Sequence, residues 1–559
     1  MSEPSPPVSR RVELYDTTLR DGTQGLGVAL SLKDKLNIAR LLDALGFDYI
    51  EGGYPLSNPK DVAFFEEAAK LNWRHARLCA FGMTRRKGVR AADDVGMNAL
   101  VDARTPVITI VGKTWDLHVD EVLRVSRDEN LAMIEDSVAF CHKQLKQRDD
   151  AHEVFYDAEH FFDGYKANPA YALATLRAAV QGGASRLVLC DTNGGSLPGW
   201  IRQAAGEVMR ELQLQQPTHD NPTPTPSLAI HTHNDSGLAV ANSLEAVAAG
   251  AVQVQGTING IGERCGNVDL ISVAANLQLK MHHDVLQPGK LQRLTELSRY
   301  VYELANMNLA PGQPFVGAGA FAHKGGMHVH AVQRLARSYE HIEPQLVGNE
   351  RRILVSELSG ASNIAATLGQ KFDIEHDKDV QRRVLNRVQD LENQGYQFEA
   401  ALASFELLLY EALDRRRPYF DLDHYRCVIL KRDHEPTSTE AIVKLNVGDA
   451  LEHCVAEGDG PVDALSGALR KALAPHYPQV EHVKLTDYKV RVVNPTAGTA
   501  AKVRVTVDFL VLPDGETESS AHRSFTTIGV NENIVDASWQ AIADAFEYHL
   551  LETAAPSLM

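Results

Sequence analysis

Cysteine is scarce in this chain, and the spacing of the few cysteines excludes two common stabilising devices. The 559 residues contain six of them: Cys79, Cys141, Cys190, Cys265, Cys427 and Cys454. No two form a C-x-x-C pair, so neither a structural zinc site nor a dense disulfide framework is expected. Scattered free thiols are typical of a reducing compartment, which predicts a cytoplasmic protein.

Long apolar runs and excess positive charge are missing as well. No run approaches the roughly 18 apolar residues that are needed to span a bilayer. Residues 1–10, MSEPSPPVSR, lack the apolar segment of a signal peptide and are expected to form a disordered tail. The formal net charge of −17 argues against nucleic acid or a membrane surface as a partner. A small anionic substrate is still compatible with this net charge, because nearby arginine, lysine or metal charges determine whether such a substrate binds.

What the chain does contain, from residue 11 to 285, is a regular alternation of short β-branched segments and segments with helical periodicity. The expected strands cover residues 12–18, 49–54, 77–82, 107–112, 153–159, 186–192, 228–235 and 252–260. Between the first two, leucines recur at helical spacing from Leu32 to Leu45, and Gly46 is expected to end the helix. Eight such units predict a (β/α)8 TIM barrel. A doubly wound sheet is the alternative, disfavoured because no G-x-G-x-x-G follows a strand.

Polar residues stand where the expected strands end. The first strand runs into D-T-T-L-R-D-G (16–22) and the seventh ends in H-T-H-N-D (231–235), while Glu51 and Glu159 close two others. After the eighth strand comes G-I-G-E-R-C-G-N (260–267), whose glycines permit a tight turn beside a ligand. The carboxyl ends of barrel strands are where such enzymes place their chemistry, so these segments are expected to meet at one site.

Two histidines and a carboxylate within these segments suggest a metal site. His231 and His233 are two residues apart in a strand, so their side chains share one face and could hold one divalent ion. Asp21 could add a carboxylate, and Arg20 offers a planar cationic fork that suits a carboxylate ligand. Alternatively, the two histidines could be ordinary core residues whose hydrogen bonds are satisfied within the protein. The polar residues at the other strand ends disfavour this alternative.

The rest of the chain reads as two further regions. Residues 286–420 combine amphipathic and charged helical segments with a glycine- and histidine-bearing passage at 310–331, and are expected to form helical linker subdomains. Residues 421–559 repeat three strand-like segments and an amphipathic helix, with Val-Asp-Ala at 462–464 and again at 535–537. Two βββα units predict an α+β regulatory domain that supports dimerisation and senses a small ligand between the repeats.

Taken together, these motifs resemble a known family. D-T-T-L-R-D-G, H-T-H-N-D and G-x-G-E-R-x-G-N resemble signatures of the 2-isopropylmalate, homocitrate and citramalate synthases, metal-dependent barrel enzymes that condense acetyl-CoA with a 2-oxo acid. The duplicated C-terminal module resembles that family's allosteric dimerisation domain, so the resemblance covers nearly the whole chain. Segments 315–331, FVGAGAFAHKGGMHVHA, and 353–364, ILVSELSGASNI, are most similar to the citramalate synthase branch, which uses pyruvate.

The resemblance implies a divalent metal ion and its ligands. The family's metal ligands fall on four residues of this chain: Asp21, His231, His233 and Asn267. This set of imidazole, carboxylate and amide ligands, without a thiolate, suits Mg, Mn or Zn acting as a Lewis acid. A 2-oxo acid would chelate the ion through its carboxylate and keto oxygens.

The resemblance also assigns substrate-binding and catalytic residues. The arginine that handles the substrate's carboxylate and the developing alkoxide falls on Arg20, and Thr192 matches the threonine that contacts the 2-oxo acid's carboxylate. Glu159 matches a glutamate near the reacting centre. His328 matches a histidine that the partner subunit's linker delivers to the site. Asp157 stands where some citramalate synthases carry a tyrosine lining the pyruvate pocket, which leaves the shape of that pocket open.

The expected reaction needs a base, because the acetyl methyl of acetyl-CoA is only weakly acidic. His328 assisted by Glu159 is one candidate, and a metal-bound or glutamate-activated water is the other. For the citramalate branch the products are citramalate and CoA, and the expected effector of the homodimer is isoleucine. A 2-isopropylmalate synthase, with 2-oxoisovalerate as substrate and leucine as effector, is the alternative.

Other classes fit the motifs less well. Related barrel acyl-CoA lyases use a cysteine on a glycine-rich loop, as Cys265 would be, but the E-R-C-G-N context resembles the synthase pattern. A non-catalytic effector-binding protein leaves the metal-ligand pattern unexplained. A biotin-dependent carboxyltransferase would need a Met-Lys-Met carrier segment, and the chain has none.

Overall fold

The computed structural model divides the chain into two compact units. One comprises Met1–Phe321 with Ile342–Arg351, and the other comprises Ala322–His341 with Arg352–Met559. The described residues are 9–148, 152–216, 218, 221, 223–354, 372, 374, 377–398, 401–493, 501–512 and 523–554. Residues 1–8 of the expected tail and residues 355–364 of the second branch-specific segment therefore lie outside the described residues.

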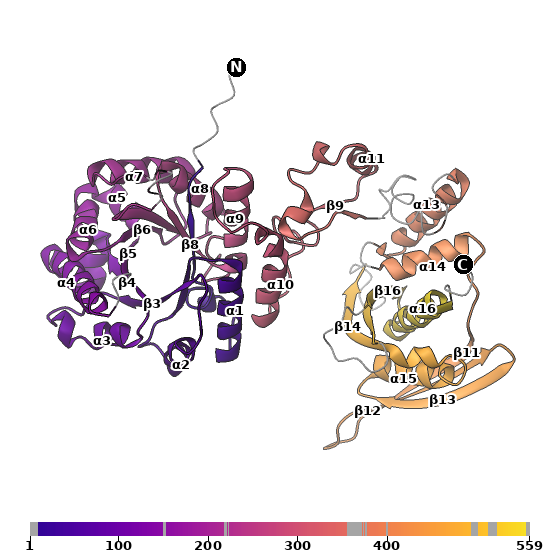
Figure 1. The fold of residues 1–559 in the computed structure, drawn as a ribbon. Helices are drawn as coiled ribbons and strands as arrows, with labels where there is room; N and C mark the ends of the chain where they lie inside the picture. The colour runs from indigo at the N-terminus through magenta and orange to yellow at the C-terminus, as the bar shows by residue number, and fades with distance from the viewer. Residues whose placement is uncertain are drawn as a thin grey trace. The chain divides into compact units, whose positions relative to one another are not determined.

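The first unit is built on a closed barrel of eight parallel strands in sequential order, which confirms the predicted TIM barrel (Figure 1). The strands are β1 Glu13–Asp16, β2 Tyr49–Gly53, β3 Arg77–Met83, β4 Val107–Lys113, β5 Glu153–Glu159, β6 Arg186–Asp191, β7 Ser227–Thr232 and β8 Gln253–Gly256. Pairing of β1 with β8 closes the ring. Strands β1, β7 and β8 end earlier than expected, because the chain turns there into the loops that carry the polar motifs.

Helices surround this ring of strands (Figure 1). They are α1 Leu32–Leu45, α2 Pro59–Ala68, α3 Val95–Asp102, α4 Arg127–Lys146, α5 Phe161–Ala167, α6 Pro169–Gly182, α7 Pro198–Glu211, α8 Ala239–Ala249, α9 Leu270–Leu279 and α10 Leu294–Leu304. Helix α1 begins with a capping box between Ser31 and Asp34 and ends at Gly46, whose φ of 90° is the left-handed conformation that glycine adopts without steric cost. The main apolar core lies between these helices and the strands.

The barrel interior is filled in layers, because alternate residues of each strand point inward. Near the amino ends of the strands, Arg186 forms buried ion pairs with Glu13 and Glu153. A packed apolar layer lies above them, formed by Tyr15, Tyr49, Cys79, Val107 and Phe155. This filled interior leaves room for a ligand only at the carboxyl ends of the strands.

The second unit contains the predicted repeat. Its elements are β9 Ala322–His323, α11 Gly326–Arg334, β10 Arg352–Ile353, α13 Lys378–Asn393, α14 Leu402–Ala412, β11 Asp421–Leu430, β12 Ser438–Val447, β13 Ala450–Gly458, α15 Pro461–Leu473, β14 Val483–Val492, β15 Val503–Val511, β16 Arg523–Asn531 and α16 Ile534–Ala554. Two three-stranded antiparallel sheets are each followed by one helix, which confirms the βββα duplication. One core joins the repeats, with Val443 and Leu469 from the first and Val507 and Phe546 from the second.

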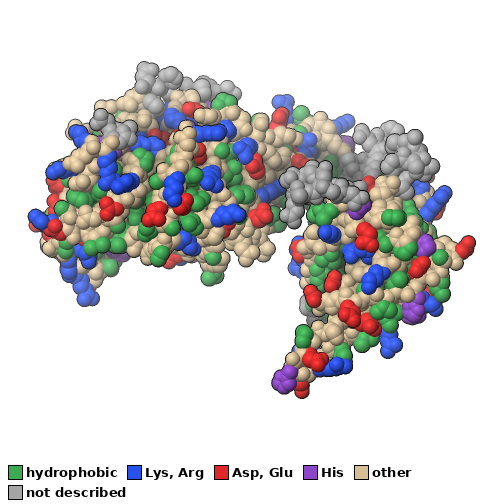
Figure 2. All heavy atoms as spheres, turned by 60° about the horizontal axis from the view of Figure 1, so that its bottom comes forward, with side chains coloured by type: hydrophobic (Ala, Val, Ile, Leu, Met, Phe, Trp, Pro, Cys, Tyr) green, Lys and Arg blue, Asp and Glu red, His purple; other side chains and the backbone are tan. Residues whose placement is uncertain are grey.

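The linker region is divided between the two units. Helix α10 belongs to the first, and α11, α13 and α14 belong to the second. The domain boundaries at residues 285 and 420 remain predictions. Among the described residues, no helix is both long and apolar enough to cross a membrane. Basic and acidic side chains are interspersed over the visible surface of each unit (Figure 2).

Candidate metal and substrate site

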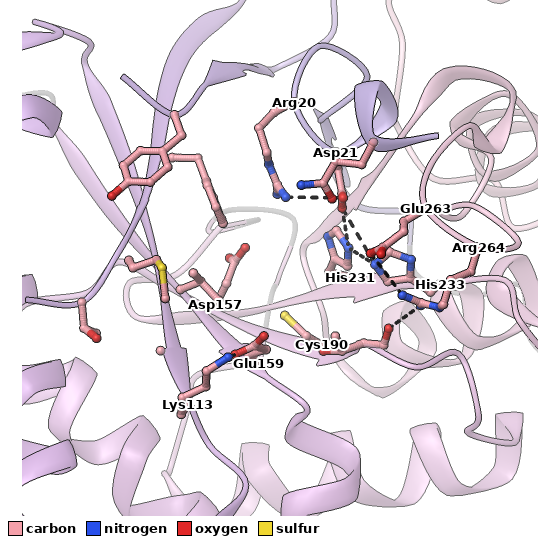
Figure 3. A pocket seen from close by; sticks show the side chains of 18 of the residues that line it. Arg20, Asp21, Lys113, Asp157, Glu159, Cys190, His231, His233, Glu263 and Arg264 are labelled. Carbon is pink, nitrogen blue, oxygen red and sulfur yellow. Dashed lines mark hydrogen bonds and ion pairs between the residues drawn. The ribbon is translucent and has the colours of Figure 1, made fainter. Parts of the chain in front are cut away.

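A cavity of about 310 Å³ opens at the carboxyl ends of the barrel strands, and the predicted motifs meet there (Figure 3). Its polar lining comes from six strands and the loops that follow them: Arg20, Asp21, Lys113, Asp157, Glu159, Thr192, His231, His233, Glu263 and Arg264. The structure thus brings together six of the seven barrel residues that the sequence assigned to the site, and the seventh, Asn267, adjoins it.

Three candidate ligand atoms converge on one point. The Nε2 atoms of His231 and His233 lie 3.3 Å apart, so the two rings share a face as their spacing predicted. The Oδ2 atom of Asp21 lies 3.4 Å from the first and 3.9 Å from the second. Ligands about 2.1 Å from one ion stand roughly 3.0–3.4 Å apart in octahedral or tetrahedral geometry. Two of the three separations match a single divalent ion, and the third, between Asp21 and His233, exceeds that range by about 0.5 Å.

Asn267 supplies the fourth candidate atom. A bridge pairs its backbone with that of His233, so the loop after β8 lies beside the end of β7. The Oδ1 atom of Asn267 is buried and has no hydrogen-bond partner among the described residues. A buried amide oxygen without a partner is costly, and a bound cation would satisfy it.

Glycines in this loop allow its backbone to pass close to the Asn267 side chain. A Cβ atom at Gly262 would overlap the side-chain amide of Asn267, and one at Gly266 would overlap the carbonyl oxygen of Gly260. Gly266 also has a φ of 86°, which L side chains rarely adopt. The loop therefore needs glycine at positions 262 and 266, because any larger residue would collide with Asn267 or with the backbone of the loop.

The charges of Asp21, His231 and His233 shift one another's pKa values. Burial would raise the pKa of Asp21, but Arg20 and the two histidines outweigh it and hold that pKa well below its usual range. Burial would lower the pKa of His231, but Asp21 raises it overall. Burial and the neighbouring His231 lower the pKa of His233 to about 4. A neutral His233 offers a lone pair to a cation.

Gln255 sets the tautomer of His231. Its Oε1 atom lies 3.1 Å from Nδ1 of His231, and its Nε2 donates to Oδ1 of Asp157 at 3.3 Å. An amide oxygen can only accept, so Nδ1 of His231 carries the proton and Nε2 directs its lone pair at the candidate ion. Burial raises the pKa of Asp157 to about 7.

Arg20 is held rigidly beside the metal-ligand group. Its Nε donates to Oε2 of Glu51 at 2.6 Å, its guanidinium lies 3.8 Å from the centre of the Phe81 ring, and its Nη1 is 3.5 Å from Asp21. Glu51 is completely buried and also accepts hydrogen bonds from Tyr15 and Thr17. The guanidinium therefore faces the cavity with its orientation already set (Figure 3).

Glu159 and Thr192 also line the cavity. Glu159 pairs with Lys113 of β4. The hydroxyl of Thr192 accepts a hydrogen bond of 2.8 Å from the backbone N–H of His160, so its own hydrogen remains available to a ligand. Arg264 donates to the carbonyl oxygen of Thr192 at 2.7 Å and fixes this segment from the other side.

His328 belongs to the second compact unit, whereas all the residues that line the cavity belong to the first. It stands on α11 with an exposed side chain, and its ring centroid is 4.4 Å from that of Tyr339. Its delivery to the site stays a prediction. Cys265, the residue on which the lyase alternative depended, is exposed and does not line the cavity.

Several site residues had no role assigned from the sequence. Glu51 stood out only as a polar strand end, and Lys113 and Arg264 gave no signal beyond their charge. Gln255 had a detectable signal, because Gln253 and Gln255 place two polar side chains on one face of a barrel strand. Their roles depend on side-chain contacts with other strands and loops, at separations of 24 to 72 residues along the chain.

The chain matches known protein families along most of its length. Residues 11–301 match the HMGL-like family, 315–396 the homocitrate synthase post-HMGL domain-like family, and 399–550 the LeuA allosteric (dimerisation) domain. The (R)-citramalate synthase of Geobacter sulfurreducens is 50% identical over 96% of this chain and 97% of its own length. That of Aquifex aeolicus is 48% identical over 98% and 99%.

The chain belongs to the (R)-citramalate synthase family. The 2-isopropylmalate synthase of Methanocaldococcus jannaschii is more distant, at 30% identity over 96% of this chain and 94% of its own length. The predicted resemblance to the citramalate synthase branch is therefore confirmed. Membership also favours an enzyme over a protein that only binds an effector.

Proposed function

We propose that this chain condenses acetyl-CoA with pyruvate and hydrolyses the resulting thioester, giving (R)-citramalate and CoA. The observation that carries the proposal is the identity of 43–50% to five (R)-citramalate synthases along nearly the whole chain. The convergence of Asp21, His231 and His233 in the barrel cavity supports it independently. The alternative substrate, 2-oxoisovalerate, is the less favoured because the 2-isopropylmalate synthases are more distant.

A divalent ion would be held by Asp21, His231, His233 and Asn267. Mg, Mn and Zn all accept such nitrogen and oxygen ligands, and the orphaned oxygen of Asn267 supports a hard cation. When bound, the ion supplies Lewis-acid polarisation of the pyruvate carbonyl. Gln255 keeps His231 in the tautomer that such binding requires.

Arg20 and Thr192 would orient pyruvate. The guanidinium, buttressed by Glu51, offers donors to the substrate's carboxylate and to the alkoxide that develops on the ketone oxygen. Thr192 donates its hydroxyl hydrogen to the carboxylate, because its oxygen already accepts from His160. Both groups are preorganised, so the transition state gains their interactions without further ordering.

The acetyl methyl must lose a proton to a positioned base. Glu159 lines the cavity, and Lys113 holds its carboxylate in place. We assign Glu159 to this step, either directly, through a water, or as the partner of His328 from the linker of a second subunit. Hydrolysis of the thioester then makes the overall reaction effectively irreversible.

The proposal includes feedback regulation of a homodimer by an amino acid and a location in the cytoplasm. The match to an allosteric dimerisation domain supports a homodimer with an amino-acid effector, and isoleucine is the effector expected for citramalate. All six cysteines are free thiols, which supports a reducing cytoplasm.

The decisive experiment follows release of the CoA thiol from acetyl-CoA with pyruvate, 2-oxobutyrate, 2-oxoisovalerate or 2-oxoglutarate. The expected order places pyruvate first in kcat/KM, and chelation of divalent ions should abolish turnover. Preference for 2-oxoisovalerate would transfer the chain to the leucine pathway, and no release with any oxo acid would refute a synthase.

A further inference from the structure

A network of polar side chains joins the loop after β8 to helix α10 and to the segment that follows this helix. Its members are Asn259, Ser298, Tyr302 and Gln313, and all four belong to the first compact unit. Ser298, Tyr302 and Gln313 are buried. A buried polar network whose hydrogen bonds are made stiffens the segments that it joins. The proposed function gives this network no role.

The side chain of Asn259 is the centre of the network. Its Oδ1 atom accepts hydrogen bonds from the hydroxyl of Ser298 at 2.6 Å and from Nε2 of Gln313 at 3.1 Å. Its Nδ2 atom donates to the carbonyl oxygen of Ser298 at 2.9 Å. Both ends of the amide are therefore bonded outside the loop that carries it. The φ of Asn259 is 63°, in the left-handed region that asparagine tolerates better than most residues.

Gln313 is itself fixed on two sides. Its side-chain Oε1 accepts a hydrogen bond of 2.6 Å from the hydroxyl of Tyr302, and its backbone carbonyl accepts one of 3.0 Å from the N–H of Gly317. A Cβ atom at Gly317 would overlap the backbone of Gln313, so this turn needs glycine there. The turn lies in the linker region, shortly before the chain enters the second compact unit at Ala322.

The two residues that directly follow Asn259 hold Asn267. The carbonyl oxygen of Gly260 accepts the backbone N–H of Asn267 at 3.1 Å, and that of Ile261 accepts from its side-chain Nδ2 at 3.4 Å. Because Nδ2 is turned towards Ile261, the free end of the Asn267 side chain is Oδ1, which has no hydrogen-bond partner among the described residues. Fixing Asn259 therefore fixes the carbonyl groups that orient Asn267.

We propose that Gln313 is a positioning residue for the candidate metal site and acts through Asn259 on the orientation of the Asn267 side chain. The inference rests on the ligand set of the proposed function, in which Asn267 is the fourth metal ligand. Outer hydrogen-bond partners orient a metal ligand and so raise its affinity for the ion. Gln255 does this for His231 by direct contact. The path to Asn267 is longer and begins in the linker region.

Such a path works in both directions, because the coupling free energy between two sites is reciprocal. An ion that holds Asn267 in place should therefore stabilise the docked position of residues 311–317. The metal site and the beginning of the linker would then report on each other without any contact between Gln313 and the ion.

The first test measures Mn²⁺ affinity in full-length variants by competition with a fluorescent chelator. Gln313→Met keeps the volume but removes the amide, and Asn259→Gly keeps the left-handed backbone but removes the side chain. Each should weaken Mn²⁺ binding by about fivefold or more, approaching the 10–100-fold typical of partners that bond a ligand directly.

Thr295→Val is the matched control. Thr295 is also buried on α10, but its hydroxyl donates to the carbonyl oxygen of Val347 and not to the loop after β8. This variant should change Mn²⁺ affinity by less than about twofold. Equal losses in Thr295→Val and Gln313→Met would overturn the proposal. If Gln313→Met does not fold, Tyr302→Phe, which removes only the outermost hydroxyl, takes its place with an expected loss of about two- to threefold.

Two further measurements distinguish positioning from a general loss of stability. In an Asn267→Ala background, Gln313→Met should weaken Mn²⁺ binding no further, because the side chain through which it acts is gone. Hydrogen exchange read by mass spectrometry should show that saturating Mn²⁺ slows exchange of residues 311–317 in the unmodified protein but not in Asn259→Gly. An undiminished effect in the Asn267→Ala background, or exchange that the ion leaves unchanged, would overturn the proposal.

Metal binding needs no turnover, so this inference and the proposed function can fail separately. If Gln313→Met weakens Mn²⁺ binding although no oxo acid elicits thiol release, the positioning role stands and the proposed reaction falls. If pyruvate elicits thiol release and Gln313→Met binds Mn²⁺ as tightly as the unmodified protein, the reaction stands and the positioning role falls.

Discussion

Asp16 and Asp21 belong to one motif but have different environments and different roles. The carboxylate of Asp16 accepts hydrogen bonds from the backbone and hydroxyl of Thr18, and so braces the turn after β1. The carboxylate of Asp21 faces two imidazoles across the cavity. The candidate metal ligand is therefore the aspartate whose oxygens the local backbone leaves unused.

The two histidines should be essential for metal but not for folding. His231→Ala or His233→Ala removes one of few ligands, so we expect loss of bound metal and at least about a hundredfold lower turnover. Metal content by mass spectrometry and circular dichroism would check this. His142→Ala, on α4 outside the site, is the control. Full activity in either site variant would refute the metal assignment.

Gln255 should act on metal affinity through His231. Gln255→Met keeps the volume but removes the acceptor that orients the ring, so metal affinity should fall by about 10–100-fold. Gln253→Met is a matched control on the same strand, since Gln253 bonds to Glu13 far from the cavity. Competition with a fluorescent chelator would measure both. Equal losses in the two variants would point to a general effect on the barrel.

At the scale of elements, the turn after β1 carries a pH-dependent stability that metal does not explain. Burial raises the pKa of Asp16 to about 7, so the native state favours its protonated form. The protonated carboxyl stabilises the native state fully at pH values below the ordinary carboxyl pKa. As the pH rises from there towards 7, the free energy of unfolding falls by up to about 1.4 kcal/mol per pH unit.

Asp16→Asn should remove this dependence. Relative to the unmodified protein, its melting temperature should rise as the pH increases from 5.5 to 7.5. Thermal melts of both proteins in EDTA exclude linkage to metal, and Asp93→Asn, an exposed aspartate bonded to Arg90, serves as the control. A difference that is constant across this range would contradict the role given to Asp16.

The elements themselves were largely predictable. β-Branched segments and helical periodicity located all eight barrel strands, because each element satisfies its backbone locally and shows its buried face in the sequence. Strand ends were less predictable: β7 ends at Thr232 and not at Asp235. Directly after that end, His233 forms an isolated bridge with Asn267 in the loop after the neighbouring strand β8, a contact that the sequence does not reveal.

At the scale of the whole molecule, the duplicated domain should couple assembly to control. Because its two repeats share one core and match a dimerisation family, light scattering should give a mass about twice 61.4 kDa. Isoleucine should inhibit turnover with pyruvate and leucine should inhibit it less. A monomer at assay concentration, or equal inhibition by both amino acids, would contradict this regulation.

The sequence by itself determined the barrel, the βββα repeat and the shared face of His231 and His233. These depend on periods of two, about 3.6 and 73 residues, which sequence spacing records directly. Only the tertiary structure decided that Glu51 buttresses Arg20, that Gln255 orients His231, and that Asn267 reaches the same point. The Arg20–Glu51 and His231–Gln255 contacts join neighbouring strands at separations of 31 and 24 residues, and barrel closure places β8, which precedes Asn267, against β1. No local sequence pattern encodes these side-chain pairings.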